Sequence, residues 1–146
     1  MSGIDQLFTD VISPEAQLIS VHPKQSTYLA TTIIVRGQVT LSDMRRNIDR
    51  IRNQLNFVPW NTNAWKTGLC DIPPLGQKYS ILSLSNSSGI WRIMDRLQTR
   101  FVKLYKRKAH LHHYLNYMEQ EEFESAIRNI RSVIDGYQKL ESNIQR

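Results

Sequence analysis

The spacing of apolar side chains in the first part of the chain alternates between the period of a helix and that of a strand. Residues 3–12 place apolar side chains three and four positions apart, which predicts a short helix that ends at Ser13. A run rich in β-branched residues at 28–35 predicts a strand, apolar on both faces and therefore covered on both sides, with a turn at Gly37. The other elements predicted here are a helix capped by Ser42 and Asp43, a strand at 65–72 and a strand at 79–85.

From Ser88 onward the pattern is helical throughout, with no strand signal. Ser88 opens a long helix, and a break near Asn116 and Tyr117 separates it from a second helix that begins at 119–122. The stripe predicted to be buried on the long helix consists of Ile90, Met94, Leu97, Phe101, Leu104, Leu111 and Leu115. The stripe on the second helix consists of Phe123, Ile127, Ile130, Ile134 and Tyr137.

These elements predict an α/β fold: a two-layer sandwich of helices on a small mixed β-sheet, followed by an antiparallel helical hairpin laid over it. We expect two domains, an α/β domain at 1–87 and the hairpin at 88–146. The first helix begins almost at Met1 without a capping residue before it, so we expect this sequence to be part of a longer chain.

Composition narrows the class of protein without identifying it. The chain has 146 residues, of which 40% are hydrophobic and 22% charged, as in a globular domain that needs neither disulfides nor metal. Its one cysteine, Cys70, excludes an internal disulfide and a cysteine-rich zinc cluster. The sequence has no apolar run long enough for a membrane span and no signal peptide. A formal net charge of +6 favours an acidic partner.

Basic residues on the predicted long helix form a stripe along one face. Its members are Arg92, Arg96, Arg100, Lys103 and Arg107, with Lys106 and Lys108 beside them. Such a stripe suits an acidic protein surface or a phosphate backbone, or it is simply the solvated face of an amphipathic helix. No aromatic platform and no nucleic-acid-binding motif accompanies it, so we keep a basic nucleic-acid-binding module as the alternative function.

The sequence offers no recognisable catalytic or metal-binding group. His110, His112 and His113 lie close together, but no acidic or cysteine ligand lies within a helical turn of them, so we expect packing or hydrogen-bonding histidines and no metal. Cys70 lies in a strand pattern, where cysteine is most often a small buried hydrophobic residue. Because the chain lacks a P-loop, a G-x-G-x-x-G loop and a G-x-S-x-G elbow, we expect no cofactor and no enzyme activity in this chain.

Two tryptophans, Trp60 and Trp65, flank a polar loop rich in asparagine. An exposed tryptophan is enriched among the residues that dominate binding at protein interfaces. A tryptophan is also a large apolar side chain that domains bury in their own cores. The pattern of residues leaves both interpretations open.

Several strings, in this order, resemble the C-terminal half of the tubulin family over about residues 3–140. They are Arg36-Gly37, Phe57-Val58 with Trp60, Lys66, Cys70-Asp71-Ile72-Pro73-Pro74, Asn86-Ser87, Arg107-Lys108-Ala109 with Leu111-His112 and Tyr114, and Glu122-Phe123. Within the family the chain is most similar to the epsilon class. The strings that carry this choice are Arg36-Gly37-x-Val39, Ser42-Asp43-x-Arg45-Arg46-Asn47-Ile48, Trp60-Asn61-x-x-x-Trp65-Lys66-Thr67 and the run from Leu104 to Leu115.

The resemblance implies a role in assembly. It implies that the Gly-rich nucleotide loop, the acidic residue that triggers hydrolysis and one strand of the sheet lie upstream of this sequence, so that GTP is bound in the full-length parent and not in this chain. It implies a protein of the cytoplasm and cytoskeleton, at centrioles and basal bodies, the microtubule organising centre. The implied partners are delta-tubulin, alpha- and beta-tubulin and centriolar proteins, and neither nucleic acid nor membrane.

The resemblance also implies where subunits meet. In tubulins the loop matched by Trp60–Lys66 and the helix end matched by Lys108–His113 face the next subunit along the protofilament. We therefore expect Trp60 to be an interface anchor, with Lys66 and Lys108 steering an acidic or nucleotide-bearing face towards it. The expected interface residues are Trp60, Asn61, Trp65, Lys66, Lys108, His112 and His113.

Overall fold

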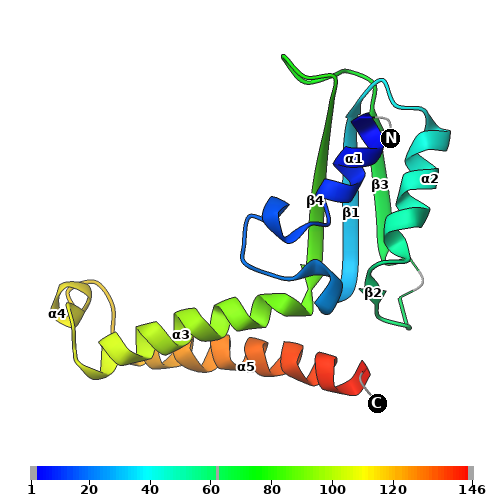
Figure 1. Cartoon of the computed structure of the whole chain (residues 1–146). Helices are drawn as coiled ribbons and strands as arrows, with labels where there is room; N and C mark the ends of the chain where they lie inside the picture. Colours follow the sequence, from blue (N-terminus) through cyan, green and yellow to red (C-terminus); the bar gives the residue numbers. More distant parts are fainter. Residues whose placement is uncertain (1–2, 62, 145–146) are drawn as a thin grey trace. The chain divides into compact units, whose positions relative to one another are not determined.

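The computed structural model describes residues 3–61 and 63–144 (Figure 1). The chain divides into two compact units, one that ends at Gly89 and one that begins at Ile90. The first contains the sheet with its helices and the second contains a helical hairpin, so the predicted α/β class is confirmed.

The elements of the first unit follow the predicted order, with differences at their ends. They are α1 (Gly3–Asp10), the short 3₁₀ turns η1 (Pro14–Ala16) and η2 (Pro23–Gln25), β1 (Thr27–Gly37), α2 (Leu41–Arg52), β2 (Asn56–Phe57), β3 (Trp65–Cys70) and β4 (Tyr79–Ser87). The 3₁₀ turn η3 (Ser88–Ile90) spans the boundary between the two units. The predicted cap of α2 is wrong, because the side chain of Thr40 accepts the hydrogen bond from the Asp43 backbone N–H at 3.1 Å. β2 was not predicted, since two residues are too short to show a strand period.

β1 is the central strand of a four-stranded mixed sheet. Its two ends pair in parallel with β2 and β3 along one edge, and β4 pairs with it antiparallel along the other. Val35 lies opposite Leu69 of β3 and Ile81 of β4, which sets the register of the three long strands. Every other strand of the unit is therefore positioned by hydrogen bonds to β1.

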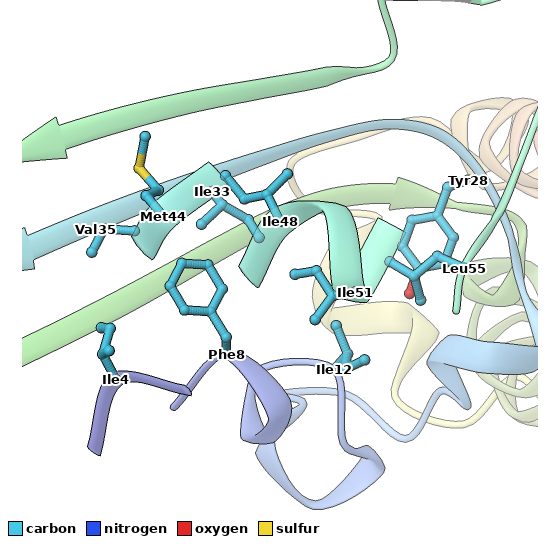
Figure 2. Packing of buried hydrophobic residues seen from close by; sticks show 10 residues of the cluster. All are labelled: Ile4, Phe8, Ile12, Tyr28, Ile33, Val35, Met44, Ile48, Ile51 and Leu55. Carbon is cyan, nitrogen blue, oxygen red and sulfur yellow. The ribbon is translucent and has the colours of Figure 1, made fainter. Parts of the chain in front are cut away.

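Helices α1 and α2 cover one face of β1 and form the core with it, as Figure 2 shows. The buried members of this core are Ile4, Phe8, Ile12, Tyr28, Ile33, Val35, Met44, Ile48, Ile51 and Leu55. Burial also raises the pKa of the Tyr28 hydroxyl to about 12. The prediction that β1 is covered on both faces is wrong in this chain: Ile33 is 1% exposed whereas its neighbour Ile34 is 37% exposed. An apolar side chain on each face satisfies the sequence pattern, but within the described residues of the first unit α1 and α2 cover one face.

A polar cluster joins the exposed sides of α1 and α2. The Asp5 carboxylate accepts hydrogen bonds from Arg46 at 2.9 Å and from the buried Asn47 at 2.7 Å. The hydrogen bond with Asp5 raises the pKa of Arg46, which therefore stays charged. Arg50 adds a bond to the Asp5 backbone carbonyl at 2.7 Å. These bonds fix how α1 lies along α2 without adding apolar area.

The second unit is an antiparallel hairpin of α3 (Trp91–Lys106) and α5 (Gln120–Ile144), with the short helix α4 (Leu111–Tyr114) between them. The two long helices run side by side in Figure 1. Among the contacts that join them, the Gln98 side chain donates to the Ile127 carbonyl at 2.9 Å, Trp91 Nε1 donates to Glu141 at 3.0 Å, and Arg131 pairs with Asp95 at 3.5 Å. The predicted hairpin is confirmed.

The predicted end of the long helix is wrong. We expected it to run from Ser88 to a break near Asn116, but α3 ends at Lys106, and Lys108 and His110 have left-handed backbone angles with φ of 53° and 58°. Neither residue is glycine, so nothing in the sequence pattern marked the break.

The predicted buried stripe of α3 is also mostly exposed. Leu97 is 59% exposed, Phe101 38% and Leu104 55%. Trp91, Gln98 and Tyr105 make the polar contacts with α5. Phe101 of the stripe stacks on Phe123 of α5 and is still partly exposed.

Gly37 ends β1 at a backbone angle that L-residues rarely adopt, with φ of 119°. A Cβ there would also collide with the Lys78 carbonyl oxygen and lie 2.9 Å from the Tyr79 ring. We expect Gly37→Ala to lower the free energy of unfolding by about 3 kcal/mol, from backbone strain plus overpacking. Urea denaturation followed by far-ultraviolet circular dichroism measures this loss.

Gly76→Ala is the matched control for that substitution. Gly76 also has a positive φ, of 75°, but a Cβ there meets nothing within 4 Å. We expect its loss to be about 1 kcal/mol, from backbone strain alone. Equal losses at the two positions would contradict the close packing between the end of β1 and the start of β4.

Candidate functional site

The loop between β2 and β3 is tied to β1 at both ends. The Val58 backbone N–H and the Asn61 side chain donate to carbonyls of β1 at 3.0 Å and 2.8 Å. On the other side of the loop, the Thr31 N–H donates to the Ala64 carbonyl at 2.7 Å. Val58 and Ala64 are themselves buried. The described ends of the loop are therefore anchored to the central strand of the sheet. Thr62, which belongs to the predicted contact loop, lies outside the described residues.

Trp60 projects from this anchored loop. Its exposed fraction is 64%, so its ring is not part of the core of the first unit. Val58 and Asn61, whose hydrogen bonds to β1 anchor the loop, lie on either side of Trp60 in the sequence. Of the two interpretations that the sequence left open, the structure therefore excludes the core position for Trp60.

Trp65 is placed differently, at the start of β3. It is partly buried and packs against the core, with its ring 5.6 Å from that of Phe57, which is 5.5 Å from that of Tyr28. Its buried Nε1 has no hydrogen-bond partner among the described residues. Trp65 therefore contributes to packing within its own unit. Its indole N–H is shielded from water and has no hydrogen bond within the described residues to replace the lost one.

The four remaining predicted interface residues besides Asn61 are exposed. Lys66 follows Trp65 on β3, so its side chain points to the face of the sheet that α1 and α2 do not cover. Lys108 lies in the left-handed turn after α3, and His112 and His113 lie on α4 with their rings 3.9 Å apart. The predicted residues thus form two local groups, one around the Trp60 loop and one around the turn at Lys108.

The structure offers no metal centre in its described part: residues 3–61 and 63–144 contain no group of three histidine, cysteine or acidic side chains placed to hold an ion. The ring of His110 stacks near that of His113, at 6.3 Å, without an acidic ligand beside them. No helix in the same residues is both long and apolar enough to cross a membrane.

One surface was missed by the sequence reasoning. The exposed side chains of α3 form part of a groove with α5, of about 320 Å³, lined by Leu97, Gln98, Phe101, Ala126, Ile127 and Ile130. The apolar stripe was recognised in the sequence but assigned to the interior. No signal in the sequence distinguishes an apolar stripe that the chain covers from one that it leaves open.

Comparison with known proteins identifies the family. The family model described as tubulin C-terminal domain matches residues 2–99. Tubulin epsilon chains of Mus musculus and Homo sapiens are 45% and 44% identical over 141 residues, which are 95% of this chain and 30% of each relative. A tubulin beta chain of Enteroctopus dofleini is 28% identical over 144 residues, 97% of this chain and 32% of that relative. The chain thus spans about a third of the length of these relatives, and the predicted resemblance is confirmed.

The two tryptophans of the loop should respond differently to truncation. We expect Trp60→Ala to change the free energy of unfolding by less than about 0.5 kcal/mol, because an exposed side chain loses little packing. Trp65→Ala should cost about 2 kcal/mol or more, because its ring packs on Phe57 against the core. Urea denaturation followed by circular dichroism compares them. A large loss for Trp60→Ala would show that its ring is covered in solution.

Proposed function

The chain belongs to the tubulin family, and on this premise we propose that it is the assembly domain of an epsilon-type tubulin. Its role is to make subunit–subunit contacts in microtubule, centriole or basal-body structures of the cytoskeleton. The proposal is supported by the kind of relatives that the chain resembles over 95% of its length. No residue of the chain is assigned a catalytic role.

The single observation that carries the proposal is the exposed Trp60 on an anchored loop. Binding normally costs free energy for ordering flexible loops and side chains. Here the hydrogen bonds of Val58 and Asn61 to β1 have already ordered the segment on either side of Trp60. Tryptophan is enriched among interface hot spots, and here an anchored segment presents its ring to solvent. Trp60 is therefore the proposed anchor of a subunit contact.

The other predicted interface residues have supporting roles in this proposal. Lys66 and Lys108 are exposed cations that attract an acidic face of the partner and raise the association rate. His112 and His113 extend the contact at α4, and Asn61 holds the loop. The proposed partners are other tubulins, delta-tubulin first and alpha- or beta-tubulin next, together with centriolar proteins.

In this proposal, GTP binds to the full-length parent and not to this chain. Phosphate groups are bound by glycine-rich loops whose backbone N–H groups point at the ligand, usually at a helix N-terminus. No such loop occurs in this sequence. The chain therefore contributes contacts, and the nucleotide is bound and hydrolysed elsewhere in the parent.

Truncating the proposed anchor tests the function directly. We expect Trp60→Ala to weaken binding to purified delta-tubulin or alpha/beta-tubulin by about 30-fold, the effect of losing about 2 kcal/mol at a hot spot. Lys66→Ala should mainly slow association, more so at low salt. Biolayer interferometry with immobilised tubulin gives both rates.

Leu75→Ala is the control, because Leu75 is fully exposed and lies outside the Trp60 loop. It should bind like the unaltered chain. If Trp60→Ala also binds normally, the Trp60 loop is not the contact. If the chain instead binds random DNA in a salt-sensitive manner and no tubulin, the basic nucleic-acid-binding module is the correct function.

A calorimetric titration tests the assignment of the nucleotide. We expect no specific heat when GTP and magnesium are titrated into this chain, because no backbone loop surrounds the phosphates. Saturable binding in the micromolar range would contradict the assignment and would place a nucleotide site within these residues.

A further inference from the structure

The turn that ends α3 has a backbone conformation that its residues disfavour. The Lys108 backbone N–H donates to the Tyr105 carbonyl at 2.8 Å. The Ala109 N–H donates to the Leu104 carbonyl at 3.1 Å. This pair of bonds is the Schellman motif, in which the residue at the place of Lys108 has left-handed angles and is usually glycine. Here it is lysine, with φ of 53°, and His110 follows with φ of 58°. Because both residues carry a Cβ, the turn is strained.

Apolar contacts of α4 hold the chain in this turn. Leu111 of α4 is buried, at 7% exposed. It lies against a cavity of about 280 Å³ that Leu104, Tyr114 and Phe123 also line. The Tyr114 ring meets the Phe123 ring of α5 edge-on, with 6.0 Å between their centroids. Burial of Leu111 therefore offsets the strain of the turn, but the cavity beside it leaves this contact incompletely packed.

The same residues have a second conformation open to them, namely the uninterrupted helix that the sequence predicts. Between Lys106 and Leu111 the sequence contains neither glycine nor proline, and lysine, arginine, alanine and leucine are good helix formers. Extending α3 through these residues would remove both left-handed angles. It would also move α4, because a change in the sign of φ at two positions redirects the chain that follows. The two conformations therefore balance backbone strain against the burial of Leu111.

We propose that the turn from Lys108 to His110 is a two-state switch that positions the α4 side of the subunit contact. In the bent state, which the structure shows, Leu111 is docked and the turn is left-handed. In the straight state Leu111 leaves its site and α3 continues through α4. Lys108 lies in the turn, and His112 and His113 lie on α4, so the switch moves these proposed interface residues together. The switch rests on the function proposed above, since a tubulin partner that contacts them in one state selects that state.

Glycine and alanine at position 108 measure the strain without any partner. Both substitutions remove the lysine charge, but only glycine adopts left-handed angles readily. We expect Lys108→Gly to unfold at a temperature about 3 °C higher than Lys108→Ala, as followed by circular dichroism at 222 nm. Arg100→Gly and Arg100→Ala are the matched control, because Arg100 is an exposed cation inside α3. There the order should reverse, with glycine about 3 °C lower than alanine.

Nuclear magnetic resonance of the isotope-labelled full chain tests the switch itself. The backbone chemical shifts of His110 report whether its φ is left-handed, as in the structure. We expect Leu111→Ser to move them to the values of a right-handed helix, because the loss of apolar burial leaves the strain without an offset. Adding Lys108→Gly should return His110 to left-handed values, whereas adding Lys108→Ala should not. Leu111→Met keeps the apolar contact and should leave the shifts unchanged.

Opposite results would overturn the proposal. Left-handed shifts at His110 that persist in Leu111→Ser would mean a fixed turn. An unfolding temperature of Lys108→Gly at or below that of Lys108→Ala would mean a turn without strain, and this comparison stands even if Leu111→Ser does not fold.

Binding to immobilised tubulin connects the switch to the subunit contact. Leu111→Ser should bind about tenfold more weakly than Leu111→Met, because fewer molecules are in the bent state. Equal binding of the two variants would mean that the switch does not position the contact. If the unaltered chain binds no tubulin, the proposed function fails, whereas the chemical shifts and unfolding temperatures still decide whether the switch exists.

Discussion

The first unit depends on the hydrogen bonding of β1 along both of its edges. β1 pairs with β2 and β3 on one side and with β4 on the other, and its residues Ile33 and Val35 are buried beneath α1 and α2. Burying the backbone of a strand is favourable only when its N–H and C=O groups are paired. The neighbours of β1 satisfy those groups, and the two helices supply the apolar contacts. All other elements of the unit are placed relative to this strand.

Hydrogen bonding to β1 also positions the proposed contact loop. β1 supplies the carbonyls that hold Val58 and Asn61 and the N–H that holds Ala64. Consequently the loop is part of the sheet's hydrogen-bond network although it is not a strand. Trp65, at the end of the loop, packs on Phe57 against the core, whereas Trp60 is exposed. The two tryptophans thus have different environments, because Trp65 begins strand β3 whereas Trp60 lies in the turn before it.

The hairpin is held by polar contacts between α3 and α5 together with the stacking of Phe101 and Tyr105 on Phe123. Gln98 is buried and donates to a backbone carbonyl of α5, and Trp91 donates to Glu141. A buried donor without a partner costs more than an exposed leucine, so these contacts decide which side of α3 faces α5. Leu97 and Leu104 are then left exposed, at 59% and 55%.

The sequence by itself determined the order of elements, the strand at β1 and the hairpin, because these follow from the spacing of apolar residues and from turn residues. It also determined the membership of a family, which follows from specific strings of residues. It did not determine the end of α3, since the left-handed turn at Lys108 and His110 uses residues that give no signal of a break. It also did not determine which tryptophan is buried or which stripe is covered. Periodicity shows that a face is apolar, but only the tertiary structure decides whether another element lies against that face.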